Sequence, residues 1–141
     1  MTHYLDTSVV IALLTPEAHS DRIDTWFAAH PEAALAISPW VITEIASALS
    51  IKLRSGAIDA DQRALVMARW QQMLSDSISV LPVTQPHFEA AANFAAQHAL
   101  GLRAGDALHL AVAADAGCSL LTLDQVMAAA APHVGIPVDP L

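Results

Sequence analysis

The stretch His3-Tyr4-Leu5-Asp6-Thr7-Ser8-Val9-Val10 indicates the architecture of this chain of 141 residues. A short apolar run meets an acidic residue, and a segment with helical character follows at once. An acidic residue at such a junction caps the helix, because its carboxylate accepts hydrogen bonds from free backbone N–H groups. The pattern predicts a strand at residues 3–5, a helix at residues 8–14 and Asp6 at the carboxyl end of the strand.

Strand-like and helix-like segments alternate along the rest of the chain. Further strands are predicted at residues 33–37, 78–83, 119–123 and, at an edge because Pro137 cannot lie in a central strand, 134–138. Further helices are predicted at residues 18–29, 39–55, 60–75, 84–101, 104–116 and 125–131. This alternation predicts an α/β fold with a parallel sheet covered by helices on both faces.

The composition suits a folded protein. Hydrophobic residues make up 55% and charged residues 14%, which provides a substantial core and argues against disorder. The length suits a single domain, residues 1–141. No apolar run approaches the roughly 20 residues that span a bilayer, and no signal peptide is recognisable. Cys118 is the only cysteine, which excludes an internal disulfide and favours a reducing, cytoplasmic setting.

The charge balance bears on possible partners. The formal net charge is −8, and the chain has only six Lys and Arg residues. Taken alone, this balance argues against nucleic acid as a partner, because Lys and Arg supply phosphate binding. Metal ions held by acidic residues would add positive charge. An acidic chain is also a natural partner for a basic protein segment.

Four acidic residues lie at element boundaries or inside a helix: Asp6, Glu44, Asp106 and Asp124. If the strands are parallel, all four side chains converge at the carboxyl ends, where open α/β sheets bind ligands. Four converging carboxylates cannot all stay ionised without a positive charge among them. A hard divalent cation, Mg²⁺ or Mn²⁺, is the simplest candidate.

Each of these residues also has a purely structural interpretation. Asp6, Asp106 and Asp124 are each suited to cap the helix that follows. Glu44 lies too far inside its helix to cap it, and it either faces solvent or is paired. Thr7 and Ser8 follow the first acidic residue, and their hydroxyls are suited to bind a metal-bound water or a phosphate oxygen, or to cap the helix.

The basic residues and histidines leave further alternatives. Arg103 is suited to hold a substrate phosphate beside the metal, or to form a salt bridge with Asp106. Lys52 either offsets phosphate charge or belongs to a solvated helix end. His109 lies one turn after Asp106 and either reaches the same crevice or occupies the core or helix surface. Thr122 is interpreted as a residue that only fills its strand.

Together these segments resemble the PIN-domain family and, within it, the VapC-type toxins of bacterial toxin–antitoxin pairs. The resemblance rests on four stretches that occur in the same order as in the family: Tyr4–Val10, Val41–Leu49, Leu102–Ala111 and Leu120–Asp124. It covers essentially the whole chain. Each stretch alone is weak evidence, but all four acidic positions in one chain of this length make a fairly specific signal.

The resemblance implies a Rossmann-like α/β/α sandwich and a Mg²⁺- or Mn²⁺-dependent endoribonuclease. It also implies a cognate antitoxin as inhibitor, autoregulation through DNA binding by the complex, and a homodimer. The family motif carries the metal-binding acidic role to four positions, Asp6, Glu44, Asp106 and Asp124. It carries the usual hydroxyl to Thr7 or Ser8. Many relatives have a further acidic or amide residue soon after the last Asp, whereas Gln125 and Val126 follow here, so one and two metal ions both remain open.

Two other classes of function fit the same residues. One is a non-catalytic PIN-fold binding module that holds a basic partner segment in its acidic crevice. The other is a phosphotransfer protein or phosphatase that uses Asp6 as an aspartyl nucleophile. Such sites usually need a second acid two residues later, and Ser8 occupies that position.

Overall fold

The computed structural model describes all residues from Met1 to Leu141. Its strands are β1 (Thr2–Leu5), β2 (Ala34–Ile37), β3 (Ile78–Val80) and β4 (Ser119–Leu121). Its α-helices are α1 (Thr7–Leu14), α2 (Ser20–Ala29), α3 (Pro39–Arg54), α4 (Ala60–Asp76), α5 (Gln85–Ala96), α6 (Ala104–Asp115) and α7 (Gln125–Ala130). Two short 3-10 helices complete the set, η1 (His98–Leu100) and η2 (Ala131–Val134).

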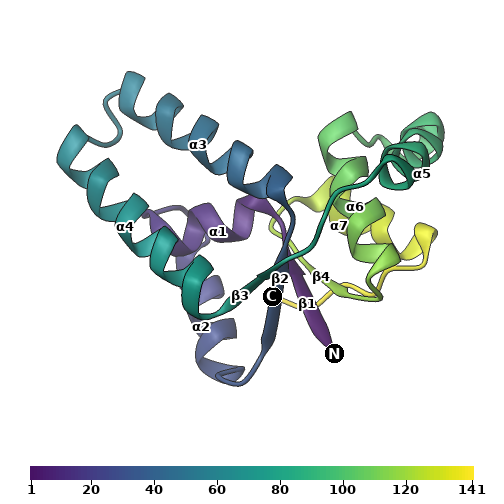
Figure 1. The fold of residues 1–141 in the computed structure, drawn as a ribbon, viewed down its shortest axis with the longest axis horizontal. Coiled ribbons are helices and arrows are strands. Elements are labelled where there is room, and N and C mark those ends of the chain that lie inside the picture. Colours follow the sequence, from purple (N-terminus) through teal and green to yellow (C-terminus); the bar gives the residue numbers. More distant parts are fainter.

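The four strands form one parallel sheet in the order β3-β2-β1-β4, so β1 lies between β2 and β4 (Figure 1). Tyr4 of β1 pairs with Ala36 on one side and with Leu120 on the other. Parallel strands share one carboxyl edge. The residues that follow β1 and β4, including Asp6 and Asp124, therefore reach the same edge of the sheet.

Helices lie on both sides of this sheet, with α1 to α4 on one side and α5 to α7 on the other (Figure 1). α1 packs against α2 and α3, and α5 packs against α6. The central strand is enclosed between these layers, and Tyr4 and Leu5 are fully buried. The prediction of an α/β fold with a parallel sheet covered on both faces is confirmed.

Local sequence explains where several helices begin. Asp59 accepts a hydrogen bond from the N–H of Gln62, whose side chain accepts one from the N–H of Asp59. This reciprocal capping satisfies two backbone donors at the start of α4. Pro39 opens α3, where its missing N–H costs nothing and its fixed φ suits the helix. These features place Glu44 in the second turn of α3.

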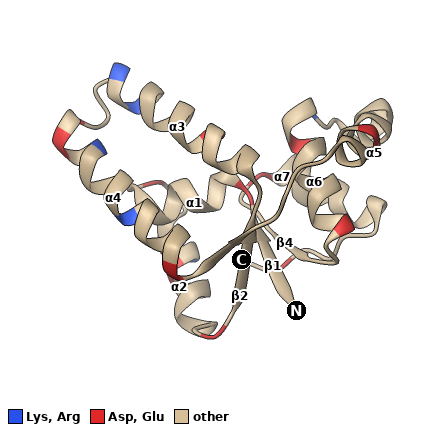
Figure 2. Ribbon diagram, in the orientation of Figure 1, with Lys and Arg blue, Asp and Glu red and all other residues tan.

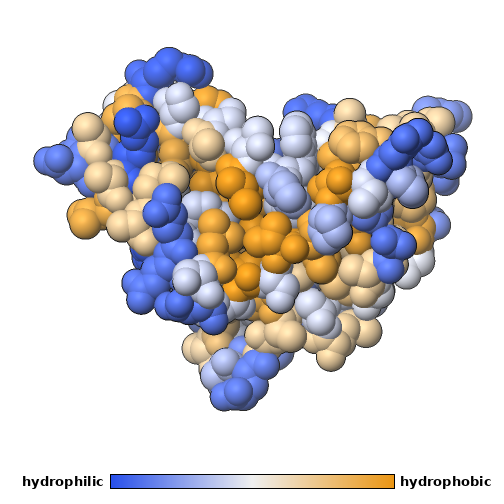
Figure 3. Space-filling model, viewed as in Figure 1, coloured by the Kyte–Doolittle hydropathy of each residue, from blue (hydrophilic) through white to orange (hydrophobic).

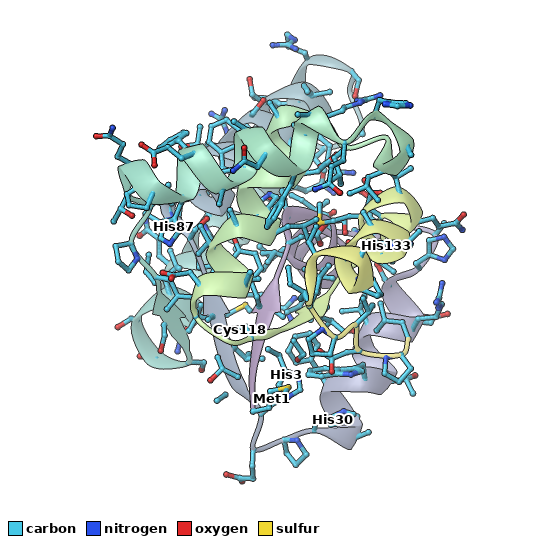
Figure 4. All side chains as sticks on the ribbon, turned by 90° about the vertical axis from the view of Figure 1, so that its right-hand side faces the viewer. Met1, His3, His30, His87, Cys118 and His133 are labelled. Carbon is cyan, nitrogen blue, oxygen red and sulfur yellow. The ribbon has the colours of Figure 1, made fainter.

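The last residues of the chain run beside β4. The N–H of Leu120 donates to the carbonyl of Pro137, and the N–H of Asp139 donates to the carbonyl of Leu120. Asp139 also contacts the side chains of His3 and Ser119, both at 2.8 Å. His3 lies near the amino end of the sheet (Figure 4). This segment therefore covers the outer edge of β4.

Three predicted elements are wrong in extent or type. The expected strand at residues 134–138 is absent apart from a single bridge between Val138 and Leu120, because η2 occupies residues 131–134. The strand expected at 78–83 ends at Val80, ahead of Pro82, which has no N–H to donate. The helix expected to end near Gly101 ends at Ala96, and η1 follows it.

The molecular surface is hollowed between the group of α3 and α4 and the group of α5 and α6 (Figure 3). Hydrophobic residues gather at the centre of that face, over β3 and the segment after it. Exposed large hydrophobic side chains include Ile42 on α3, Val80 on β3 and Phe88 on α5. None of the helices combines the length with the apolar character that a bilayer-spanning segment needs.

Candidate active site

Asp6 follows β1 directly, and its side chain is only 3% exposed. Its Oδ1 accepts hydrogen bonds from the hydroxyl of Ser8 at 2.6 Å and from the N–H of Val9 at 3.3 Å. Its Oδ2 accepts one from the hydroxyl of Thr122 at 2.8 Å. Burial raises the pKa of Asp6, although the hydrogen bonds from Ser8 and Thr122 oppose that effect. Asp6 is therefore a helix cap that is also held from the other end of the chain.

Thr122 connects two of the acidic residues. Its hydroxyl donates to Asp6 and accepts a hydrogen bond from the N–H of Asp124 at 3.0 Å. Asp124 caps α7 through a bond from the N–H of Met127 at 2.9 Å. The interpretation of Thr122 as strand filler is wrong, because it lies just after β4 and positions both carboxylates. Its place two residues before an acidic cap is the only local signal of this role.

Glu44 lies on α3 with its side chain 32% exposed. Its Oε1 accepts hydrogen bonds from the hydroxyl of Thr7 at 2.8 Å and from Nε2 of His109 at 2.5 Å. Burial raises the pKa of Glu44, but the hydrogen bond and charge of His109, with the bond from Thr7, outweigh burial, so the pKa is lowered. Glu44 is therefore paired with residues of two other helices.

His109 belongs to α6 and is 2% exposed, so it is a core residue that also reaches the crevice. Its Nδ1 lies 2.9 Å from the hydroxyl of Tyr4, and that hydroxyl donates to Ser38 at 2.8 Å. Burial raises the pKa of the Tyr4 phenol, which keeps it protonated. Because an ionised carboxylate only accepts, Nε2 of His109 must carry the hydrogen that it shares with Glu44. This chain of contacts runs from β1 to α3 through α6.

Asp106 lies in the first turn of α6 and is partly exposed, and no side chain donates a hydrogen bond to it. Burial is the largest cause of the raised pKa of Asp106, and the negative charges of Asp124 and Glu44 raise that pKa further. Asp106 thus lies within the electrostatic reach of two other acidic residues. Acidic positions gather where α3, α6 and the ends of β1 and β4 approach one another (Figure 2).

The basic residues are arranged differently from what sequence alone suggests. Arg103 is exposed at the N-cap of α6. It forms no salt bridge with Asp106, so the predicted alternative of an Arg103–Asp106 ion pair is wrong. Lys52 is not a solvated helix end, because its Nζ lies 2.6 Å from the carboxylate of Glu17. Other Lys and Arg residues lie mainly on α3 and α4, away from this region (Figure 2).

The donor chemistry of this region fits a hard divalent cation. Carboxylate oxygens are the ligands that Mg²⁺ prefers. Glu44 Oε2 and Asp124 Oδ2 have no hydrogen-bond donor, and no side chain donates to Asp106, which the backbone of Arg103 contacts. The mutual repulsion that raises the pKa of Asp106 is the effect that a cation would relieve. No three His, Cys, Asp or Glu side chains lie close enough to hold an ion as they stand.

The aspartyl-nucleophile alternative has less support from this geometry. Both oxygens of Asp6 accept hydrogen bonds, and its side chain is almost wholly buried. An aspartyl nucleophile must also be open enough to receive a phosphoryl group, which is larger than a metal ion, whereas Asp6 is closed in by its neighbours. Thr7 and Ser8 use their hydroxyls to hold Glu44 and Asp6, so they act on the carboxylates in this arrangement.

Comparison with solved structures gives close similarity over almost the whole chain. FitAcB from Neisseria gonorrhoeae has a TM-score of 0.73 at 19% identity, covering 99% of this chain and 97% of that one. VapC20 from Mycobacterium tuberculosis, described as a sarcin-ricin loop cleaving toxin, has a TM-score of 0.72 at 21% identity, with 92% and 95% covered. PAE2754 from Pyrobaculum aerophilum has a TM-score of 0.67 at 28% identity, with 92% and 79% covered.

No curated protein matches this chain in sequence. The sequence model of the PIN domain matches residues 3–131, which include all four acidic residues of the site. That match spans most of the chain. The chain therefore belongs to the PIN-domain family.

Proposed function

We propose that this chain is a Mg²⁺- or Mn²⁺-dependent endoribonuclease and the toxin component of a toxin–antitoxin pair. The observation that carries the proposal is the gathering of Asp6, Glu44, Asp106 and Asp124 at one edge of the sheet, where Asp124 and Glu44 raise the pKa of Asp106. Such a cluster is electrostatically costly without a cation. The similarity to VapC20, a sarcin-ricin loop cleaving toxin, supports the choice of RNA as substrate.

In this proposal Asp6, Asp106 and Asp124 hold the cation, and Glu44 completes the acidic set. The chemistry supplied there by a cation would be a lowered pKa of a water ligand and stabilisation of the charge that develops on the phosphodiester. Thr122 and Ser8 hold the carboxylate of Asp6 in one orientation.

His109 and Thr7 hold the carboxylate of Glu44, and the lowered pKa of Glu44 keeps it ionised. Arg103, which is exposed at the N-cap of α6, would bind a substrate phosphate. Thr7 and Ser8 remain candidate substrate contacts, since a hydroxyl that donates to a carboxylate can still accept.

The partner expected for a toxin is a cognate antitoxin with a basic segment. Similar structures include VapBC2 from Rickettsia felis bound to a promoter DNA fragment and a toxin-antitoxin complex from Klebsiella pneumoniae. A formal net charge of −8 favours a partner that carries Lys or Arg. The exposed Ile42, Val80 and Phe88 make a homodimer a further part of this proposal.

Cleavage of total RNA by the purified chain tests the proposal. Wild type should cut RNA with Mg²⁺ or Mn²⁺ and should stop cutting in EDTA, and Asp6→Asn should be inactive with metal present. Glu32→Gln is the matched control, since Glu32 is exposed and makes no side-chain contact. Cleavage by Asp6→Asn at the wild-type rate would rule out the assigned role of Asp6.

A non-catalytic binding module is the second candidate. It is favoured by the observation that no three acidic side chains lie close enough to hold an ion. A module of this kind should show no thermal shift with Mn²⁺, whereas a metal site should be stabilised by mass action. It should instead bind an Arg-rich peptide with or without metal.

A further inference from the structure

A polar hollow of about 190 Å³ opens beside Asp124 on the side of α2. Its polar lining comes from α2, from the end of β4 with α7, and from the last residues of the chain: His19, Arg22, Thr122, Asp124, Gln125 and Asp139. Thr122 is the residue that holds Asp6. The hollow is therefore continuous with the proposed catalytic residues.

A second hollow, of about 240 Å³, lies next to the first and shares His19 and Leu123 with it. Its lining includes Ser8, whose hydroxyl donates to Asp6, and Glu17. The two hollows together lie along the start of α2. They pass Ser8 and Thr122, the two residues that donate hydrogen bonds to Asp6. A strand of RNA that places one phosphate at the carboxylates has a path along this side.

Arg22 is the only Lys or Arg in either hollow. Its Nη2 donates to the backbone oxygen of Leu141 at 3.0 Å, and it forms no salt bridge with any carboxylate. Lys52 is already paired with Glu17, and Arg69 lines a different hollow with Asp24. Arg22 thus has a single hydrogen-bond partner, the backbone oxygen of the last residue in the sequence.

We propose that Arg22 binds a phosphate of the RNA strand next to the phosphate that is cleaved. A guanidinium is suited to this task, because its planar donors match two phosphate oxygens and it stays charged at all relevant pH values. A phosphate oxygen can replace the Leu141 oxygen as acceptor. Asp124 and Asp139 line the same hollow, and a cation held at the acidic site would offset their charge together with that of the RNA.

This inference rests on the proposed function, and its test separates the two. Binding is measured by fluorescence anisotropy with a labelled single-stranded RNA of mixed sequence, in Mg²⁺, with Asp6→Asn present so that the RNA is not cut. Arg22→Gln is compared with Arg63→Gln, which removes the same charge from the exposed part of α4. Circular dichroism melting checks that each variant is folded.

Arg22→Gln should raise Kd about tenfold, the loss expected for one charge-assisted phosphate contact. The slope of log Kd against log salt should fall by about 0.7, the value for one phosphate neutralised on a single strand. Arg22→Lys should keep that slope, and Arg63→Gln should change neither quantity. A purely structural role in holding Leu141 would leave the salt slope unchanged.

Equal affinity and equal slope for Arg22→Gln and Arg63→Gln would overturn the role of Arg22 while leaving the nuclease proposal intact. If, in addition, wild type bound an acidic peptide more tightly than Arg22→Gln does, the hollow would be assigned to a protein partner. If wild type neither binds nor cuts RNA, both the proposed function and the role of Arg22 are wrong.

Discussion

His109 and Glu44 join α6 to α3 across the acidic site, with Nε2 of His109 2.5 Å from Oε1 of Glu44. The two residues are 65 positions apart in the sequence. His109 also contacts the hydroxyl of Tyr4 on the central strand. One imidazole therefore ties together the sheet and the two helices that carry Glu44 and Asp106.

His109→Ala should lower the free energy of unfolding by about 2–4 kcal/mol. The variant loses a hydrogen bond to a charged group, leaves the Tyr4 hydroxyl with one contact fewer and opens a cavity. Urea denaturation measures the change, and His98→Ala, at an exposed histidine of η1, is the control. An equal loss in both variants would mean that the contact with Glu44 contributes nothing to stability.

Thr122→Val should raise the pKa of Asp6 further and lower the free energy of unfolding by about 1–2 kcal/mol. Valine keeps the shape but removes the donor to Asp6 and the acceptor for the N–H of Asp124. Because protonation of Asp6 reduces the need for a donor, the loss should be larger at neutral pH than in acid. Urea denaturation at both pH values checks this, with Thr25→Val on the exposed face of α2 as control.

Asp106→Asn should make the metal-free protein more stable at neutral pH. The folded pKa of Asp106 is raised above its ordinary value of 3.8, so its ionisation opposes folding. The contribution of protonated Asp106 to the free energy of unfolding is therefore fully present below pH 3.8. It is lost as the pH rises through the raised pKa of the folded state. The gain at pH 7 should be under about 1 kcal/mol, since this partly exposed carboxylate is screened by solvent.

Thermal melting from pH 3 to pH 7 without divalent metal checks the effect of Asp106→Asn. The wild-type and variant curves should meet near pH 3 and separate as the pH rises. Glu32→Gln should follow wild type throughout. A variant that is less stable than wild type at pH 7 would show that Asp106 is a structural cap and is not strained by its acidic neighbours.

Addition of Mn²⁺ should raise the melting temperature of wild type. A ligand that binds only the folded state stabilises by mass action, by about 2.7 kcal/mol at 100 times its Kd. Asp106→Asn and Asp124→Asn should each abolish most of this shift, and Glu32→Gln should retain it. Equal shifts in all four proteins would place the bound ion elsewhere on the molecule.

Much of the fold was predictable because local signals coincide with tertiary packing. Asp6 and Asp59 cap helices as their sequence context predicts, and the alternation of strands and helices gives the parallel sheet. The failures lie where proline and long-range pairing decide the outcome. Val138 meets Leu120 at one bridge only, and Pro82 follows the early end of β3, outcomes that apolar patterning does not reveal.

The candidate site was predictable in its acidic residues but not in their supports. Parallel topology places Asp6 and Asp124 at one edge, and this follows from sequence. The donors Thr122 and His109 reach their partners over separations of 116 and 65 residues. Their spacing to Asp124 and Asp106 places them near the site, but it does not identify Asp6 and Glu44 as their partners. Arg22 was missed because α2 carries Asp21 and Asp24 beside it, which suggests an ordinary solvated helix face. The catalytic and metal-binding roles of the acidic residues remain predictions.

The pairing of β1 with β4 also bears on synthesis. β1 can pair with β2 while the chain is growing, but its other neighbour, β4, begins only at Ser119. Until that strand leaves the ribosome, Asp6 has no Thr122 to hold it and Asp124 does not yet exist. A nascent chain is therefore unable to assemble the acidic site, and a hydrolytic activity toward RNA would be withheld from the ribosome that makes it until translation is nearly complete.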